Sequence, residues 1–176
     1  MTQAPSPFDG RRWQIDADTL GSGKSGQIEA SPAECQAAAA ALDLLDCAGL
    51  VLVYDLQPLS RRRFRLQARL SCQVTQASVV SLEPVPARIE EDVESELWPE
   101  GETPEGSGDA ALDVLNAPVT ETYEAGRIDL GQIAYELLSV SLDPYPKNEG
   151  EVLAEDLGAA SQALSPFAAL AQLRKG

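Results

Sequence analysis

Apolar and polar residues alternate most clearly over residues 63–75. Apolar residues occupy the even positions of this segment: Phe64, Leu66, Ala68, Leu70, Cys72 and Val74. Polar residues occupy the odd positions, the other parity: Arg63, Arg65, Gln67, Arg69, Ser71, Gln73 and Thr75. Successive side chains of a strand point to opposite faces of the sheet. The pattern therefore predicts a long antiparallel strand with one buried face and one polar face.

A second alternating segment follows the Leu82-Glu83-Pro84 turn. Its apolar residues occupy odd positions: Val85, Ala87, Ile89, Val93 and Leu97. Its charged residues occupy even positions: Arg88, Glu90, Asp92, Glu94 and Glu96. A hairpin about the turn would pair the two apolar faces without a conflict of register. It would also place the arginines of the first strand opposite the acids of the second, where opposite charges stabilise the pairing.

Two segments have the pattern of helices. Ser31-Pro32-Ala33-Glu34 has the form of a capping box with proline at the first helical position, followed by an apolar stripe of Cys35, Ala38, Leu42 and Leu45 and a stop near Gly49. Asp129-Leu130-Gly131-Gln132 resembles a second capping box, and its stripe is Leu130, Ile133, Ala134, Leu137 and Leu138. Ser165-Pro166 opens a shorter final helix.

These elements predict an α+β fold. We expect a mostly antiparallel sheet or a partly closed barrel, two main helices and a short C-terminal helix, with further short strands near Trp13 and at 50–54. Residues 1–10 are expected to form a flexible N-terminus, and residues 11–176 a single domain. A mobile acidic loop is expected at about 99–118, where proline, glycine and acids follow no period.

Composition narrows the possible functions. The chain has no histidine, which removes the commonest general base and metal ligand. Cys35, Cys47 and Cys72 have unrelated spacings and are interpreted as small buried hydrophobic residues in a reducing compartment. Because no apolar run is long enough to cross a bilayer and no secretory signal is recognisable, we expect a cytoplasmic protein without a membrane partner. Neither a cofactor, a metal nor an enzymatic activity is expected.

The net charge of −15 is concentrated in one stretch. Residues 89–125 contain twelve acids and no lysine or arginine, whereas residues 1–88 contain nine acids and nine bases. Such a segment repels nucleic acid and attracts basic proteins. A solvated, purely solubilising segment explains the charge equally well. If it is a binding surface, the candidate residues are Glu90, Glu91, Asp92, Glu94 and Glu96, with Arg63 and Arg65 on the neighbouring strand; DNA is not an expected partner.

Two motifs suggest sharper alternatives. Residues 21–26 (GSGKSG) suggest a nucleotide-binding loop using Gly23, Lys24 and Ser25. A loop that binds phosphate in this way needs a glycine five positions before Gly23 and a helix directly after the Lys-Ser pair. Position 18 is aspartate instead, and no helix follows the pair. Arg61 to Arg65 interleave with Phe64 and suggest RNA contact, but the alternation turns Phe64 inward. Direct RNA contact therefore stays open.

Three stretches together resemble the YceD family: residues 79–91 (VVSLEPVPARIEE), 126–150 (GRIDLGQIAYELLSVSLDPYPKNEG) and 165–175 (SPFAALAQLRK). The family commonly has a Cys-x-x-Cys pair just before Leu-Glu-Pro, and this chain has Ser78 and Ser81 there, so the resemblance implies no metal or redox role for that pair. Val80 also stands where an arginine is frequent.

The resemblance implies a non-catalytic factor that supports accumulation of the large-subunit ribosomal RNA (23S) and ribosome biogenesis. The expected partner is a basic ribosomal protein or a pre-ribosomal particle. The positions that match the family's pattern are Glu83, Pro84, Arg127, Asp129, Asp143, Tyr145, Pro146, Phe167 and Leu170. Most of these residue types are also explained by turns and helix caps.

Overall fold

The computed structural model describes residues 6–8, 10–60, 62–102 and 119–152. The strands are β1 (Gln14–Asp16), β2 (Lys24–Glu29), β3 (Asp46–Ser60), β4 (Arg63–Ala77), β5 (Pro84–Pro99), β6 (Val119–Tyr123) and β7 (Arg127–Asp129). The helices are α1 (Pro32–Ala41) and α2 (Leu130–Ser141), with short 3-10 turns at Arg11–Trp13 and Ala17–Thr19. The predicted C-terminal helix lies outside the described residues.

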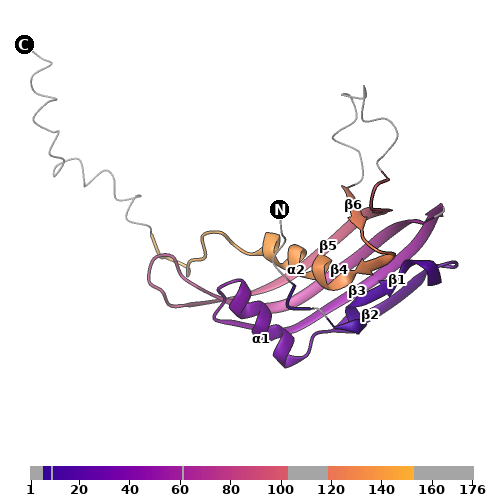
Figure 1. The fold of residues 1–176 in the computed structure, drawn as a ribbon. Helices are drawn as coiled ribbons and strands as arrows, with labels where there is room; N and C mark the ends of the chain where they lie inside the picture. The colour runs from indigo at the N-terminus through magenta and orange to yellow at the C-terminus, as the bar shows by residue number, and fades with distance from the viewer. Residues whose placement is uncertain (1–5, 9, 61, 103–118, 153–176) are drawn as a thin grey trace, which may run out of the picture.

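One five-stranded sheet organises the fold, in the order β2-β3-β4-β5-β6, and β1 pairs with β7 in a separate two-stranded sheet. All pairings are antiparallel except that of β5 with β6. The helices α1 and α2 lie on the same face of the large sheet (Figure 1). The predicted α+β class with a mostly antiparallel sheet and two main helices is confirmed, and the described strands do not close into a barrel.

The β4–β5 hairpin has the predicted register. Phe64 pairs with Leu97 and Arg69 with Asp92, and the apolar parity of β4 is buried throughout. Because the buried parity of both strands faces the helices, the charged parity is left on the opposite face. No helix of the described residues lies on that side of the sheet, which we call the open face.

The capping box predicted at α1 is complete, whereas only half of the one predicted at α2 is formed. At α1, the Ser31 hydroxyl accepts from the Glu34 amide and the Glu34 carboxylate accepts from the Ser31 amide, which is the full capping box. At α2, Asp129 Oδ1 accepts from the Gln132 amide at 3.0 Å, but the Gln132 side chain donates to Glu136 instead of returning to the cap. Helix α1 also ends at Ala41, well before Gly49, and Leu45 is exposed.

Strand β3 is three times as long as the segment predicted at residues 50–54. It tolerates Gly49 because a register irregularity lies between Ala48 and Val51, where Gly49 adopts a positive φ of 61°. Near its other end Pro58 lies beside a second irregularity. Bulges of this kind let glycine and proline stay within a strand.

The core is aliphatic and includes the three cysteines. Cys35, Cys47 and Cys72 are buried as free thiols, as interpreted from the sequence, and burial raises the pKa of Cys35. The N-terminus adds the largest rings: Phe8 and Trp13 have no exposed surface, and their centroids are 5.0 Å apart. Residues 6–8 are thus packed against the domain, which differs from the flexible terminus expected over residues 1–10.

Candidate functional site

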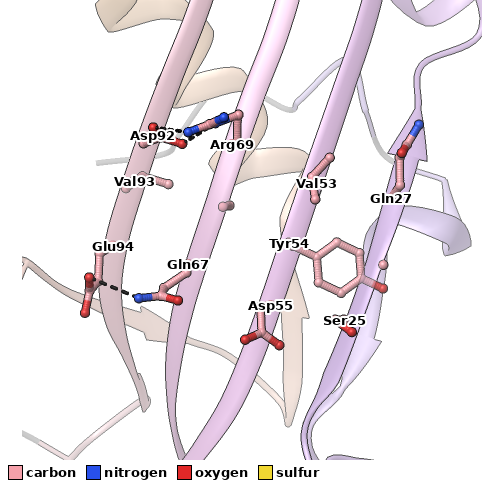
Figure 2. A pocket seen from close by; sticks show the side chains of 12 residues that line it. Ser25, Gln27, Val53, Tyr54, Asp55, Gln67, Arg69, Asp92, Val93 and Glu94 are labelled. Carbon is pink, nitrogen blue, oxygen red and sulfur yellow. Dashed lines mark hydrogen bonds and ion pairs between the residues drawn. The ribbon is translucent and has the colours of Figure 1, made fainter.

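A shallow groove crosses the open face of the sheet over β2, β3, β4 and β5 (Figure 2). Two rows of side chains form its walls: Gln27, Val53, Arg69 and Asp92 on one side, and Ser25, Asp55, Gln67 and Glu94 on the other. Its floor is the backbone of the row between them, Gly26, Tyr54, Ala68 and Val93. The side chains of Tyr54, Ala68 and Val93 point to the covered face. The walls are polar and charged apart from Val53.

Arginines of β4 and acids of β5 interact across the open face. Arg69 donates two hydrogen bonds of 2.6 and 2.8 Å to Asp92, and Glu94 accepts one from Gln67 at 3.3 Å (Figure 2). Glu94 Oε1 also lies 3.6 Å from Arg65 Nε. The hydrogen bonds from Arg69 lower the pKa of Asp92. The opposite charges predicted to meet across the hairpin therefore do so.

The predicted partner-binding residues divide between the two faces. Glu90, Asp92, Glu94 and Glu96 share the parity of the open face, whereas Glu91 has the other parity yet is still exposed. We call these five acids the acidic strip. Arg65 lies beside the strip, but the Arg63 guanidinium stacks over the Trp98 ring at 4.2 Å. Arg61, proposed for RNA contact, lies outside the described residues.

A second cluster joins the β4–β5 turn to the segment that follows α2. The Glu151 carboxylate accepts from the hydroxyls of Ser78 and Ser81, each at 2.5 Å, and from the Asn148 amide at 2.9 Å. These donors lower the pKa of Glu151 to about 2. The two serines at the family's cysteine positions therefore hold a carboxylate, which ties two parts of the chain 70 residues apart.

Several positions of the family pattern meet at this cluster. The Glu83 carbonyl accepts from the Ser78 amide and the Pro146 carbonyl from the Val79 amide, while the Asp143 carbonyl accepts from Gln76. Tyr145 nearby is 68% exposed. Pro84 begins β5, Arg127 begins β7 and Asp129 caps α2. These contacts are structural, and Phe167 and Leu170 lie outside the described residues.

The sequence reasoning missed a hollow between β6, β7 and α2. Its lining includes Glu121 and Glu136, and burial followed by the charge of Glu136 raises the pKa of Glu121. Glu121 pairs with Leu97 and thus points to the covered face. The alternation of residues 119–123 could have indicated that Glu121 points inward, because it lies two residues before the buried Tyr123 and so on the same face of the strand. Within the described ranges, no group of three or more cysteines, aspartates or glutamates is placed to hold a metal ion.

The glycine-rich stretch 21–26 does not form a helix N-terminus. Gly23 has a positive φ of 82°, and the chain then enters β2 at Lys24, which pairs with Leu56 of β3. The next helix begins only at Pro32. Backbone amides that pair within a sheet cannot converge on a phosphate, so this geometry does not favour the nucleotide-binding alternative. Residues 24–26 are thus part of a strand.

The fold and its surfaces define a class of protein: an α+β domain whose five-stranded sheet carries a charged face that the described helices leave uncovered. Comparison with known proteins adds the family. The model of the family described as "Large ribosomal RNA subunit accumulation protein YceD" matches residues 66–174, more than half of the 176 residues, and the chain belongs to this family. No curated protein and no solved structure matches the chain.

Membership of the family connects the chain with accumulation of the RNA of the large ribosomal subunit. The matched region begins within β4 and includes all of β5, β6, β7 and α2. Both the acidic strip and the Ser78–Glu151 cluster are inside it. None of the helices in the described part of the chain is long and apolar enough to span a membrane.

Proposed function

We propose that this protein supports accumulation of the large-subunit ribosomal RNA as a non-catalytic factor in the cytoplasm, by binding a basic ribosomal protein or ribonucleoprotein through its acidic strip. The observation that carries the proposal is the concentration of exposed carboxylates on β5, inside the region that matches the family. An ordered row of acids on a rigid strand presents a fixed negative potential. Such a potential speeds encounter with a basic partner and disfavours acidic competitors.

The arrangement of the strip favours protein over bare RNA as the partner. Phosphate binding depends on lysine and arginine. The described arginines of the open face are already engaged: Arg69 with Asp92, Arg65 with Glu94, Arg88 with Glu90 and Arg63 with Trp98. Single-stranded RNA sites also use exposed aromatic side chains. The aromatic residue beside Arg63, Trp98, is only 8% exposed.

The proposal is tested by capture from cell lysate with a neutralised strip. The full-length variant Glu90→Gln/Glu91→Gln/Glu94→Gln removes three exposed charges and leaves the Arg69–Asp92 pair intact, while it breaks the ion pairs of Glu90 with Arg88 and of Glu94 with Arg65. The matched control, Glu100→Gln/Glu102→Gln/Glu124→Gln, removes the same charge at exposed positions outside the strip.

We expect the wild-type chain and the control to enrich large-subunit ribosomal proteins and precursor RNA, and the strip variant to lose most of that enrichment. In a deletion strain, the control should restore the profile of ribosomal subunits in a sucrose gradient and the strip variant should not. Equal enrichment and equal rescue by both triple variants would show that the strip is only a solubilising surface.

A further inference from the structure

Part of β5 is an open edge of the sheet in the described structure. β5 pairs with β4 over Pro84–Leu97, but β6 covers its other side only from Ser95 to Pro99. Over residues 84–94, no strand among the described ranges occupies that side. Unpaired edges are sites where another extended chain can add to a sheet.

The positions of two prolines show which backbone groups face outward. Proline lacks an amide hydrogen, so within a strand it occurs where that position faces away from the neighbouring strand. Backbone N–H and C=O groups alternate sides along a strand. Since Pro84 and Pro86 share the parity of Arg88, Glu90, Asp92 and Glu94, the N–H and C=O groups of these four residues face the open side.

Carboxylates flank the outward-facing backbone groups on both faces of the sheet. Glu90, Asp92 and Glu94 project from the open face and Glu91 from the other, and all four are exposed. Arg88 is on the open face as well and forms an ion pair with Glu90, so the acidic part of the edge is residues 90–94. Arg69 approaches Asp92 from β4, so the opposite flank of Asp92 faces the unpaired side. A strand added there would have its alternate side chains opposite Glu90, Asp92 and Glu94 at the distances of cross-strand pairs.

We propose that residues 88–94 of β5 accept an extended segment of a partner protein as an added strand, and that this segment carries lysine or arginine at alternate positions. This rests on the proposed function and specifies how the basic partner is recognised. A second copy of this chain is a poor occupant, because edge-to-edge pairing of two β5 strands would place acids opposite acids. Chemical complementarity therefore selects a basic segment in extended conformation.

The test measures binding of synthetic peptides to the full-length chain together with amide hydrogen exchange. The first peptide alternates lysine with valine. The second has the same composition with its lysines contiguous, and the third is the alternating peptide with N-methyl groups on the amides that would pair with β5.

We expect the alternating peptide to bind at least tenfold more tightly than the other two, and to slow exchange of the Arg88, Glu90, Asp92 and Glu94 amides. On the protein, Glu90→Pro removes one outward donor, and Glu90→Gln is its control for loss of charge. The proline variant should bind the alternating peptide several-fold more weakly than the glutamine variant.

Three results would overturn the added strand. Equal binding of all three peptides would show attraction by charge alone, and unchanged amide exchange on binding would place the peptide elsewhere. Slow exchange of these amides in the free chain would show that the chain covers its own edge. If ribosomal proteins are still captured in any of these cases, the proposed function survives; if no ribosomal protein is captured, it fails whatever the peptides do.

Discussion

Replacing Gly131 by alanine sets two effects of opposite sign against each other. Gly131 lies in the first turn of α2, where alanine is favoured over glycine by up to about 1 kcal/mol. A Cβ atom at this position, however, would lie 1.9 Å from the carbonyl oxygen of Phe8. The atom it meets is backbone, so residues 6–8 must move away from the helix.

The cost of that movement follows from the burial of Phe8. Its ring is fully buried against Trp13, and the Ser6 hydroxyl donates to the Gly131 carbonyl at 3.1 Å. Loss of a buried phenylalanine from a core costs about 3–5 kcal/mol. Set against the gain in helix propensity, Gly131→Ala should lower the free energy of unfolding by about 2–4 kcal/mol.

Urea denaturation followed by circular dichroism measures this loss. Gly21→Ala is the matched control, because a Cβ atom there meets nothing within 4 Å, and we expect it to change stability by less than about 0.5 kcal/mol. The Phe8→Ala/Gly131→Ala double variant should lose less than the sum of the two single variants, since both act on the same contact. A Gly131→Ala variant as stable as wild type, or strictly additive losses, would refute the reasoning.

Three further predictions concern the cluster, the hollow and a helix cap. The pKa of Glu151 is lowered from 4.5 to about 2 in the folded chain, so its contribution to stability is present above about pH 4.5 and lost as the pH falls toward 2. Amide exchange at Ser78 and Ser81 should therefore accelerate over that pH range in the wild-type chain, and Glu151→Gln should abolish this acid-dependent step. The same pH profile of exchange in the wild type and in the Glu151→Gln variant would contradict this prediction. Burial raises the pKa of Glu121 and so disfavours its charged form. Glu121→Gln should therefore leave rescue of the deletion strain intact and should not lower stability at pH 7. Loss of rescue in a folded variant would instead indicate catalysis or binding in the hollow. Ser31→Ala should lower the free energy of unfolding by about 1 kcal/mol through loss of the N-cap of α1, whereas Ser139→Ala at an exposed position should be neutral.

The parts of the fold that the sequence predicted are those set by local or strictly periodic chemistry. Parity alone determined the register of the β4–β5 hairpin, because a slip of one residue would bury its arginines and acids. The caps at Ser31 and Asp129 were recognisable because a cap and the amide it binds are three residues apart.

The parts that it missed depend on contacts between distant residues. Nothing near Phe8 indicates that its carbonyl will touch Gly131, and nothing near Ser78 indicates a partner at Glu151. The extent of β3 was missed because glycine and proline usually end strands, and only the bulges permit them here. Of the candidate site, the pairing of Arg69 with Asp92 followed from the register, whereas the stacking of Arg63 on Trp98 required the three-dimensional structure.

Crosslinking in cells with a reagent that joins carboxylates to amines tests the central claim most directly, because mass spectrometry identifies the partner and the contact surface together. We predict crosslinks from Glu90, Glu91 and Glu94 to lysines of large-subunit ribosomal proteins. Crosslinks confined to the helix-covered face, or to proteins outside the ribosome and its precursors, would contradict the account.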